Sequence, residues 1–488
     1  MKKSISISLG AIVLFAWRSL AYGPTGHEIV GEIADNRLAN TPTGAKVKTL
    51  IDGITLEKAS VIPDEIKSWD KNGADDLNQF PHYSDHPKID NQLRDFWRAN
   101  QPTHDPNLSM PSHHWFHYTD VPVLNAHKYS DGKTGRSQWD VVHMINYCVS
   151  VLKDQTSENN PRKITKPVAV ILLAHYVGDI HQPLHVGAEY FDEAGRAVDP
   201  DRGRPGIEDE GGNTIILRLR SGTPEELAHR SLKLHGFWDN DAVMANLVSL
   251  PLTVSKEERQ NKTEKAKRQL IERLSHEQPT NWRLPRDIAL ENYAEAWADE
   301  ILPIARQAHE RLEFSKIHPQ LDQDRYVSVG IAQEKILPGR IVYADWAANV
   351  VRDELHKAGW RLADLLEKVV TSTATIAAPP TTPPAPPPAE PRANASTSSQ
   401  TSPGPTSIFG AYPVDYRDIV SSWMKANRFD VSKIDWQSDP KPADVPALNG
   451  RHLYGYLVIF NMPDRAGAKT RSLLIRDQAV INVSGFDQ

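Results

Sequence analysis

One short segment of the sequence, HYVGDIHQPLH, contains three histidines and one aspartate that could bind a cation. Its first histidine, His175, is four residues from Asp179, so on a helix both side chains lie on one face, about one turn apart. The same spacing recurs at His235 and Asp239. A single pair of this kind is more typical of a helix surface than of a ligand set. Two pairs, together with His185, favour a metal site.

Pro183 bears on the direction of the last histidine in this segment. Proline cannot donate a backbone hydrogen bond, and it tends to end or kink a helix. We therefore expect the helix to end near Pro183, so that His185 turns toward a neighbouring ligand position. For His181 we expect a structural or supporting role rather than a ligand role.

The segments that must position these residues show mostly helical patterns. Between residues 22 and 370, apolar residues recur at three- and four-residue spacing in GHEIVGEIADNRL, QWDVVHMINYCVSVLKD, ITKPVAVILLAHYVGDI, PEELAHRSLKLHGFW and YAEAWADEILPIARQAHERL. Only NTIILRLR, residues 213–220, alternates as a short strand does. The pattern predicts a mainly α domain. The one cysteine, Cys148, cannot close a disulfide within the chain, and its apolar neighbours predict a buried thiol.

The composition changes sharply beyond this domain. With 488 residues, the chain is longer than one hydrophobic core usually supports, so more than one folded unit is expected. Residues 371–407 are almost entirely proline, alanine, serine and threonine, which predicts a linker biased to polyproline II. Residues 408–488 combine a helical pattern with strand-like runs such as LYGYLVIF, and they predict a small α+β domain. Its residues indicate no chemistry and no partner.

The N-terminal residues are typical of an export signal. Lys2 and Lys3 precede an apolar run over residues 5–17, and small residues at Ser19 and Ala21 fit a cleavage site. We therefore expect residues 1–21 to be a signal peptide and the protein to be secreted or periplasmic, with an uncleaved N-terminal anchor as the alternative. No later stretch reaches ~18 apolar residues, so no membrane anchor is expected beyond this run.

The overall charge identifies no partner. The formal net charge is −6, and 24% of the residues are charged. Because there is no basic excess to attract a polyanion, any contact with nucleic acid must come from a local patch or from bound cations.

Several motifs, in a fixed order, resemble one family. HYVGDIHQPLH is followed by DEGGN and LHGFWD, and it is preceded by GPTGHEIVGEIA, PDEIKSW and WFHYTDVP. Together they are similar to the single-strand-specific zinc nucleases and 3′-nucleotidases of fungi, plants and bacteria, which are distantly similar to bacterial zinc phospholipase C. The resemblance covers roughly residues 22–365, with AWADE and AGWRLADLL as further matches near its end.

The resemblance implies three zinc ions held in a mostly helical fold. One zinc would be bound by Asp64, His117, His175 and Asp179. A second would share Asp179 and add His27 with the amine and carbonyl of a mature N-terminus at Tyr22. The third would be bound by His185, His235 and Asp239.

Two points of this assignment stay open. His113 and His114, in SHHWFHY, compete with His117 for the ligand position, and we prefer His117 because Tyr118 follows it as in the family motif. Family members usually begin with tryptophan, whereas this chain would begin with Tyr22. Because backbone atoms do the ligating, the smaller ring should change packing more than chemistry. Five histidines and three aspartates, without a thiolate, are donors that suit catalytic zinc.

The same resemblance implies a mechanism and a substrate. A metal-activated hydroxide would attack the phosphorus, and the remaining zinc would stabilise the departing 3′-oxygen, which leaves 5′-phosphate products. Asp64 and Asp179 would act through the metals, and Lys67 would contact phosphate unless it is simply a solvated lysine. Tyr118 would stack on an unpaired base, unless it is a core residue, and Asn240 would contact the base.

Three functions compete at this stage. The leading one is a secreted zinc-dependent endonuclease and 3′-nucleotidase acting on single-stranded DNA, RNA and 3′-nucleotides. The second is a phospholipase C that uses the same metal cluster. The third is a surface module in which the metal site is structural and the linker displays the C-terminal domain.

Overall fold

The computed structural model divides into two compact units. The first contains the described residues up to 371, and the second contains those from 416. The predicted signal peptide, Tyr22 and the predicted linker beyond Thr371 lie outside the described residues. The structure describes residues 23–484 except 71–72, 75–82, 102–111, 125–127, 157–159, 220–232, 248–253, 323–324, 337–339, 372–415, 427–430, 432–433, 437–439, 447–451, 465–466 and 477–478.

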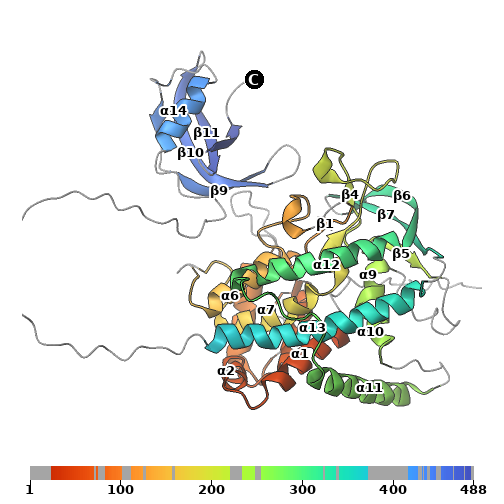
Figure 1. Ribbon diagram of the computed structural model, residues 1–488. Helices are drawn as coiled ribbons and strands as arrows, with labels where there is room; N and C mark the ends of the chain where they lie inside the picture. Colours follow the sequence, from red (N-terminus) through yellow and green to blue (C-terminus); the bar gives the residue numbers. More distant parts are fainter. Residues whose placement is uncertain are drawn as a thin grey trace, which may run out of the picture. The chain divides into compact units, whose positions relative to one another are not determined.

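The first unit is mainly helical, as predicted (Figure 1). Its α-helices are α1 (Pro24–Leu38), α2 (Pro42–Leu50), α3 (Leu56–Ala59), α4 (Ile62–Glu65), α5 (Pro87–Ala99), α6 (Val141–Leu152), α7 (Lys166–Asp179), α9 (Leu234–Gly236), α10 (Ala242–Met244), α11 (Lys256–His276), α12 (Tyr293–Glu310) and α13 (Tyr343–Thr371). Short helical turns that matter for the site are η1 (Ile66–Asp70), η2 (His113–His117), η4 (Pro183–His185) and η6 (Phe237–Asp241). Others are η3 (Tyr129–Asp131), η5 (Pro200–Arg202) and η7 (Leu290–Asn292).

Helix α7 is the centre of this unit. Every residue from Val168 to Asp179 is buried, because its sequence is apolar on all sides and the helices α1, α6 and α13 pack around it (Figure 1). Its N-terminus is capped by Thr165, whose side chain accepts a hydrogen bond from the backbone N–H of Val168. The helix ends at Asp179, and Pro183 begins the separate turn η4. The predicted helix end is therefore confirmed.

A three-stranded sheet in this unit was only partly predicted. Strand β5 (Ile215–Arg218) lies within the predicted strand and pairs in parallel with β7 (Arg325–Glu334). Strand β7 also forms an antiparallel hairpin with β6 (Leu312–Asp322), which the sequence analysis missed. Both hairpin strands bury only some of their side chains, so their apolar pattern is weak. Two small pairs join β1 (Val121–Pro122) to β2 (Gly187–Ala188) and β3 (Tyr190–Phe191) to β4 (Ile207–Glu208).

The second unit has the predicted α+β character. Helix α14 (Tyr416–Ala426) accompanies one antiparallel sheet of β8 (Asp435–Trp436), β9 (Lys441–Pro446), β10 (His452–Asp464), β11 (Gly467–Arg476) and β12 (Ala479–Ser484). Val420 and Met424 of the helix share a core with Val458, Phe460 and Leu473 of the sheet. Among the described residues of both units, no helix combines the length and the apolar character that crossing a membrane requires.

Candidate metal centre

Helices α1 and α7 bring the first two histidines together. The rings of His27 and His175 are stacked, with centroids 3.8 Å apart and planes inclined by 13°. Gly178 allows this approach, because a Cβ atom there would lie 2.8 Å from Nδ1 of His27. The Nε2 atom of His27 lies 3.3 Å from Oδ1 of Asp179. Two helices that are far apart in sequence therefore meet at one buried carboxylate.

The other oxygen of this carboxylate faces two further histidines. Oδ2 of Asp179 lies 3.1 Å from Nδ1 of His117 and 3.2 Å from Nε2 of His175. These two ring nitrogens are 2.9 Å apart, and each lies 3.8 Å from Oδ1 of Asp64. The side chains of Asp64, His117, His175 and Asp179 thus surround one small volume. Asp179 contacts both histidines.

The register question within SHHWFHY is answered by the same geometry. His117 lies at the end of η2 and points toward Asp179, whereas His113 and His114 lie beside Asp70. His117 is therefore the histidine of this segment that joins the cluster.

The backbone fixes which nitrogen of each ring is available. Nδ1 of His175 lies 2.6 Å from the carbonyl oxygen of Ser60, so this nitrogen donates its hydrogen there. Nδ1 of His185 donates to the carbonyl of His117 at 2.8 Å, and Nδ1 of His235 donates to the carbonyl of Gly211 at 2.8 Å. In each neutral ring the remaining nitrogen, Nε2, then carries a lone pair. Backbone hydrogen bonds of this kind commonly orient metal-binding histidines.

The pair formed by His185 and His235 could hold a cation. Their Nε2 atoms lie 3.1 Å apart, and in the neutral rings both nitrogens present lone pairs to each other. Burial and the neighbouring His185 lower the pKa of His235 to about 3, so a proton is poorly held there at neutral pH. A metal ion between the two nitrogens would satisfy both.

Asp239 completes this second group. Its Oδ2 atom lies 3.4 Å from Nε2 of His235 and has no hydrogen-bond partner among the described residues, while Oδ1 accepts a hydrogen bond from Gln182 at 2.8 Å. Burial, together with the charges of Asp64 and Asp179, raises the pKa of Asp239 well above its usual range, and the hydrogen bond from Gln182 and the charge of Lys67 do not outweigh it. A cation at this point would favour the ionised carboxylate.

The two groups are linked through Asp179. Its Oδ1 atom lies 3.8 Å from Nδ1 of His185. Burial alone would raise the pKa of Asp179, but the charges of His175 and His185 outweigh it and hold the pKa well below its usual range. A carboxylate that stays ionised in a buried place attracts cations. The donors offer nitrogen and oxygen in the numbers that zinc uses, so the residues present fit this metal.

The potential ligands fall into three overlapping groups whose ligand atoms lie within 4.8 Å of one another. One group differs from the expectation that His27 shares a metal only with Asp179 and Tyr22. His27 does lie near Asp179, but it also falls in one group with Asp64 and His175. All eight predicted side-chain ligands are thereby brought together. The groups are His27, Asp64 and His175; His117, His175 and Asp179; and His185, His235 and Asp239.

Comparison with known proteins agrees with this geometry. The sequence model of the family described as S1/P1 Nuclease matches residues 22–371. The chain belongs to the S1/P1 nuclease family. Similar curated proteins come from Arabidopsis thaliana. Endonuclease 4 is 28% identical over 248 residues, which are 48% of this chain and 62% of that protein. Endonuclease 2 is 23% identical, over 46% and 56% of the two chains, and Endonuclease 1 is 25% identical, over 49% and 60%. The chain therefore spans less than two thirds of these relatives.

Three more predicted residues can be placed in this S1/P1 nuclease fold. Lys67 reaches back to the cluster, with Nζ 2.6 Å from Oδ1 of Asp64. Burial alone would raise the pKa of Asp64, but the charges of Lys67 and His175 outweigh it and hold the pKa well below its usual range. Tyr118 is half-buried, and burial with the nearby charge of Asp120 raises its pKa. Asn240 is exposed and donates to the carbonyl of Gly236 at 3.2 Å.

Tyr22, the predicted N-terminal ligand, lies outside the described residues. Its neighbour Gly23 donates its backbone N–H to the carbonyl of Asp239 at 2.8 Å. The chain is thus held beside a predicted ligand one residue after the predicted mature N-terminus, Tyr22.

His181 has the structural role that we expected. Its Nδ1 atom donates to the carbonyl of Val177 at 2.7 Å, and its Nε2 atom accepts from Arg361 at 2.9 Å. Gln182, Ser60 and Gly211 orient predicted ligands, and none of the three was predicted from the sequence. The left-handed backbone of Gly211, at φ 57°, brings the DEGGN loop against His235, and only the glycines in that motif signalled it.

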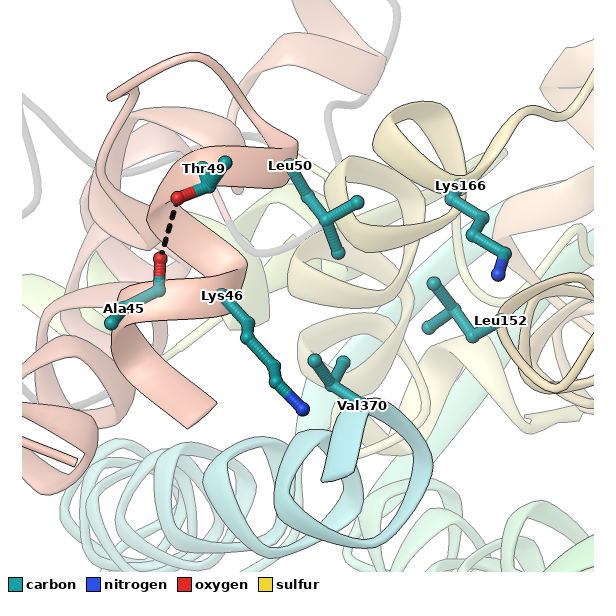
Figure 2. A pocket seen from close by; sticks show the side chains of 7 residues that line it. All are labelled: Ala45, Lys46, Thr49, Leu50, Leu152, Lys166 and Val370. Atoms are coloured by element: carbon teal, nitrogen blue, oxygen red, sulfur yellow. Dashed lines mark hydrogen bonds between the residues drawn. The ribbon is translucent and has the colours of Figure 1, made fainter. Parts of the chain in front are cut away.

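A hollow elsewhere in this unit is separate from the cluster (Figure 2). It has a volume of about 390 Å³ and lies between α2, the end of α6, the start of α7 and the end of α13. Leu50, Leu152 and Val370 supply apolar walls, and Lys46 and Lys166 lie at its edge. None of the predicted ligands lines this hollow, so we keep the candidate functional site at the cluster around Asp179.

Proposed function

We propose that the protein is a zinc-dependent endonuclease and 3′-nucleotidase that hydrolyses phosphoester bonds of single-stranded DNA and RNA. Membership of the S1/P1 nuclease family supports this proposal. The observation that carries it is the facing pair of Nε2 atoms of His185 and His235, 3.1 Å apart. In neutral rings the two lone pairs repel each other unless a cation lies between them, and a structural module would not need the adjoining cluster around Asp179.

The ligand assignment in this proposal has three parts. Asp179 would contribute to two metal positions, because each of its oxygens faces a different set of histidines. The first position would use Asp64, His117 and His175 with it, and the second would use His27 with the amine and carbonyl of Tyr22. The third would use His185, His235 and Asp239. When bound, zinc supplies Lewis-acid charge that activates water and stabilises a leaving oxygen.

The protein's own residues would orient and stabilise the reacting groups. The carbonyls of Ser60, His117 and Gly211 hold the histidine rings, so their available nitrogens need no reorientation when the site is loaded. Lys67 carries a positive charge at the edge of the cluster, where it could stabilise charge that develops on a phosphate. The expected products keep a 5′-phosphate.

Selection of single strands would depend on base stacking. An unpaired base can lie on an aromatic ring while its phosphate reaches the metals, whereas a duplex holds its bases away from the protein. We assign Tyr118 to this role because it directly follows the ligand His117, and we assign Asn240, which follows Asp239, to contact with the base. Bound zinc also accounts for phosphate binding by an acidic chain.

Export is part of the same proposal. Removal of residues 1–21 as a signal peptide would free the amine of Tyr22, and the hydrogen bond from Gly23 to the carbonyl of Asp239 supports this proposal. The mature protein would be secreted or periplasmic. Residues 371–407 would link the nuclease domain to the domain at 408–488.

The decisive experiment compares substrates and metal content. The purified mature protein is assayed on denatured DNA, duplex DNA, RNA, 3′-AMP and a phosphatidylcholine analogue, with and without a chelator. We expect hydrolysis of denatured DNA, RNA and 3′-AMP, and we expect the chelator to abolish it. The variant His235→Gln should be inactive, and the control variant His276→Gln, at an exposed residue, should be active. Hydrolysis of the lipid analogue alone would instead indicate a phospholipase C. No hydrolysis by zinc-loaded protein would indicate a binding module.

A further inference from the structure

A second cluster of metal-binding residue types lies apart from the eight predicted ligands. Asp70, at the end of η1, faces His113 and His114, at the start of η2. Its Oδ2 atom lies 2.5 Å from Nε2 of His114, and its Oδ1 atom lies 3.7 Å from Nε2 of His113. The ligand atoms of all three residues lie within 4.8 Å of one another.

One nitrogen of this cluster is buried and points at the carboxylate. His113 is 1% exposed, and its Nε2 atom has no hydrogen-bond partner among the described residues. Its ring packs edge-on against Phe96 and against His114, so its direction is set by packing. A buried ring nitrogen without a hydrogen bond costs free energy unless some other partner satisfies it.

The carboxylate of this cluster is also held in place. Nε1 of Trp97 donates to Oδ1 of Asp70 at 2.8 Å. A hydrogen bond from a neighbouring residue to a ligating carboxylate is a common feature of metal sites, because it fixes the direction of the ligand. Asp70 is therefore positioned from one side by Trp97 and meets the histidines on the other.

We propose that Asp70, His113 and His114 bind one further zinc ion, separate from the cluster around Asp179. Two imidazoles and one carboxylate form the donor set of an open zinc site, in which the fourth position is left to water or to an anion. Tetrahedral ligands at the usual zinc distances lie about 3.3 Å from each other, between the two separations observed here. Small side-chain shifts would complete the geometry.

The fourth position of this ion would open to solvent. The side chain of Asp70 is 31% exposed and that of His114 is 21% exposed, whereas Asp179 and His175 are fully buried. A ligand that arrives from solution can therefore reach this ion.

The location suggests which anion would bind. The turn η1 carries Lys67 and follows directly after α4, which carries Asp64, and η2 carries His117 at its other end. The two segments that hold the new cluster thus also hold parts of the proposed catalytic centre. Resting on the proposed nuclease function, we infer that this ion binds a second phosphate of a nucleic-acid strand.

The first experiment counts metal ions. The metal-free chain is loaded with zinc, washed and analysed for zinc per protein, alongside His114→Gln, Asp70→Asn and the control His276→Gln, a histidine whose side chain is 73% exposed. We expect the first two variants to hold one zinc fewer than the wild type and than the control. Equal zinc content in all four proteins would overturn the proposal, and it would leave Asp70 and His114 as an ion pair only.

This count is independent of catalysis. The variant His235→Gln should lose zinc from the buried cluster while it retains the ion that His114→Gln removes, so losses in the double variant should add. A protein that hydrolyses nothing but still shows the loss in His114→Gln would keep the new site and overturn the proposed function. Thermal unfolding of the metal-free variants checks that they fold.

The second experiment tests the phosphate contact. For His114→Gln we expect KM to rise about tenfold on a single-stranded oligonucleotide, the size of one charge-assisted contact, with kcat unchanged. On a 3′-mononucleotide, which has no second phosphate, KM should not change. Equal changes in KM on both substrates would overturn the phosphate assignment.

Discussion

Two buried pairs in the first unit differ in what the Nε2 atom of the histidine faces. One is His185 with His235, and the other is His309 with Asp209. In the metal centre, Nε2 of His185 faces Nε2 of His235 at 3.1 Å. On α12, Nε2 of His309 instead faces Oδ2 of Asp209 at 3.3 Å. Burial and His185 lower the pKa of His235 to about 3. Burial alone would also lower the pKa of His309, but its hydrogen bond and attraction to Asp209 raise that pKa to about 9.

The difference separates a binding site from a structural ion pair. His309 and Asp209 satisfy each other, so this pair needs nothing from solution. His185 and His235 cannot, because neither neutral ring supplies a proton to the space between them. The loop that begins at Asp209 serves both groups, since the carbonyl of Gly211 holds His235. The facing Nε2 atoms of His185 and His235 therefore indicate a cation site, whereas the self-contained pair of His309 and Asp209 gives no such indication.

The largest expected effect comes from removing the shared carboxylate charge. Asp179→Asn keeps the size of the side chain but leaves the nitrogens of His27, His117 and His175 without their anion. We expect hydrolysis of denatured DNA to fall by more than about 100-fold, the upper end for losing even an outer partner of a metal ligand. Zinc per chain should fall too. The exposed Asp353→Asn is the matched control, and retained activity in Asp179→Asn would refute the shared-ligand assignment.

The second effect is on stability when metal is removed. A chelator should lower the free energy of unfolding of the wild type, by about 4 kcal/mol where free zinc was a thousand times its Kd. The chelator should lower the free energy of unfolding of His309→Gln by a similar amount, because the pair of His309 and Asp209 binds no metal. Chemical denaturation with and without chelator measures both. A chelator effect that disappears in His309→Gln would show that the two groups are not separate.

These comparisons also show how much the sequence could reveal. The four-residue spacing of His175 and Asp179 predicted a shared face, and the repeat of that spacing at His235 marked the second group. Local spacing and family motifs therefore sufficed to predict the eight side chains that the structure brings together. The rest depends on contacts that spacing does not encode: His309 meets Asp209 across 100 residues of chain.

The same limit explains the missed sheet and the missed cluster. Strand β6 is mostly polar and mostly exposed, and its hairpin is apparent only once β7 pairs with it and with β5. Asp70 reaches His114 across 44 positions. In the sequence, His113 and His114 could be considered only as rivals of His117.

The third effect depends on pH. His309 has a folded-state pKa of about 9, above the ordinary 6.5. The pairing of His309 with Asp209 therefore contributes its full free energy of stabilisation below pH 6.5. This contribution is lost as the pH rises through 9. At pH 7 we expect His309→Gln to reduce the free energy of unfolding by about 2 to 3 kcal/mol. Denaturation curves at pH 6, 7.5 and 9.5 should show the difference narrowing. A difference that is the same at all three values would contradict the ion pair.

The smallest effect concerns the opposite end of the helix that carries His175. Thr165 caps α7 through the N–H of Val168, and its hydroxyl donates to Oε1 of Gln92. Thr165→Ala should therefore cost about 1 kcal/mol of unfolding free energy, as for other helix caps. The zinc content should not change, because Thr165 resembles His309 in having its partners within the protein. Thr165→Ser, which keeps the hydroxyl, should recover most of the loss. Reduced zinc binding in the alanine variant would instead mean that the start of α7 governs the ligands at its end.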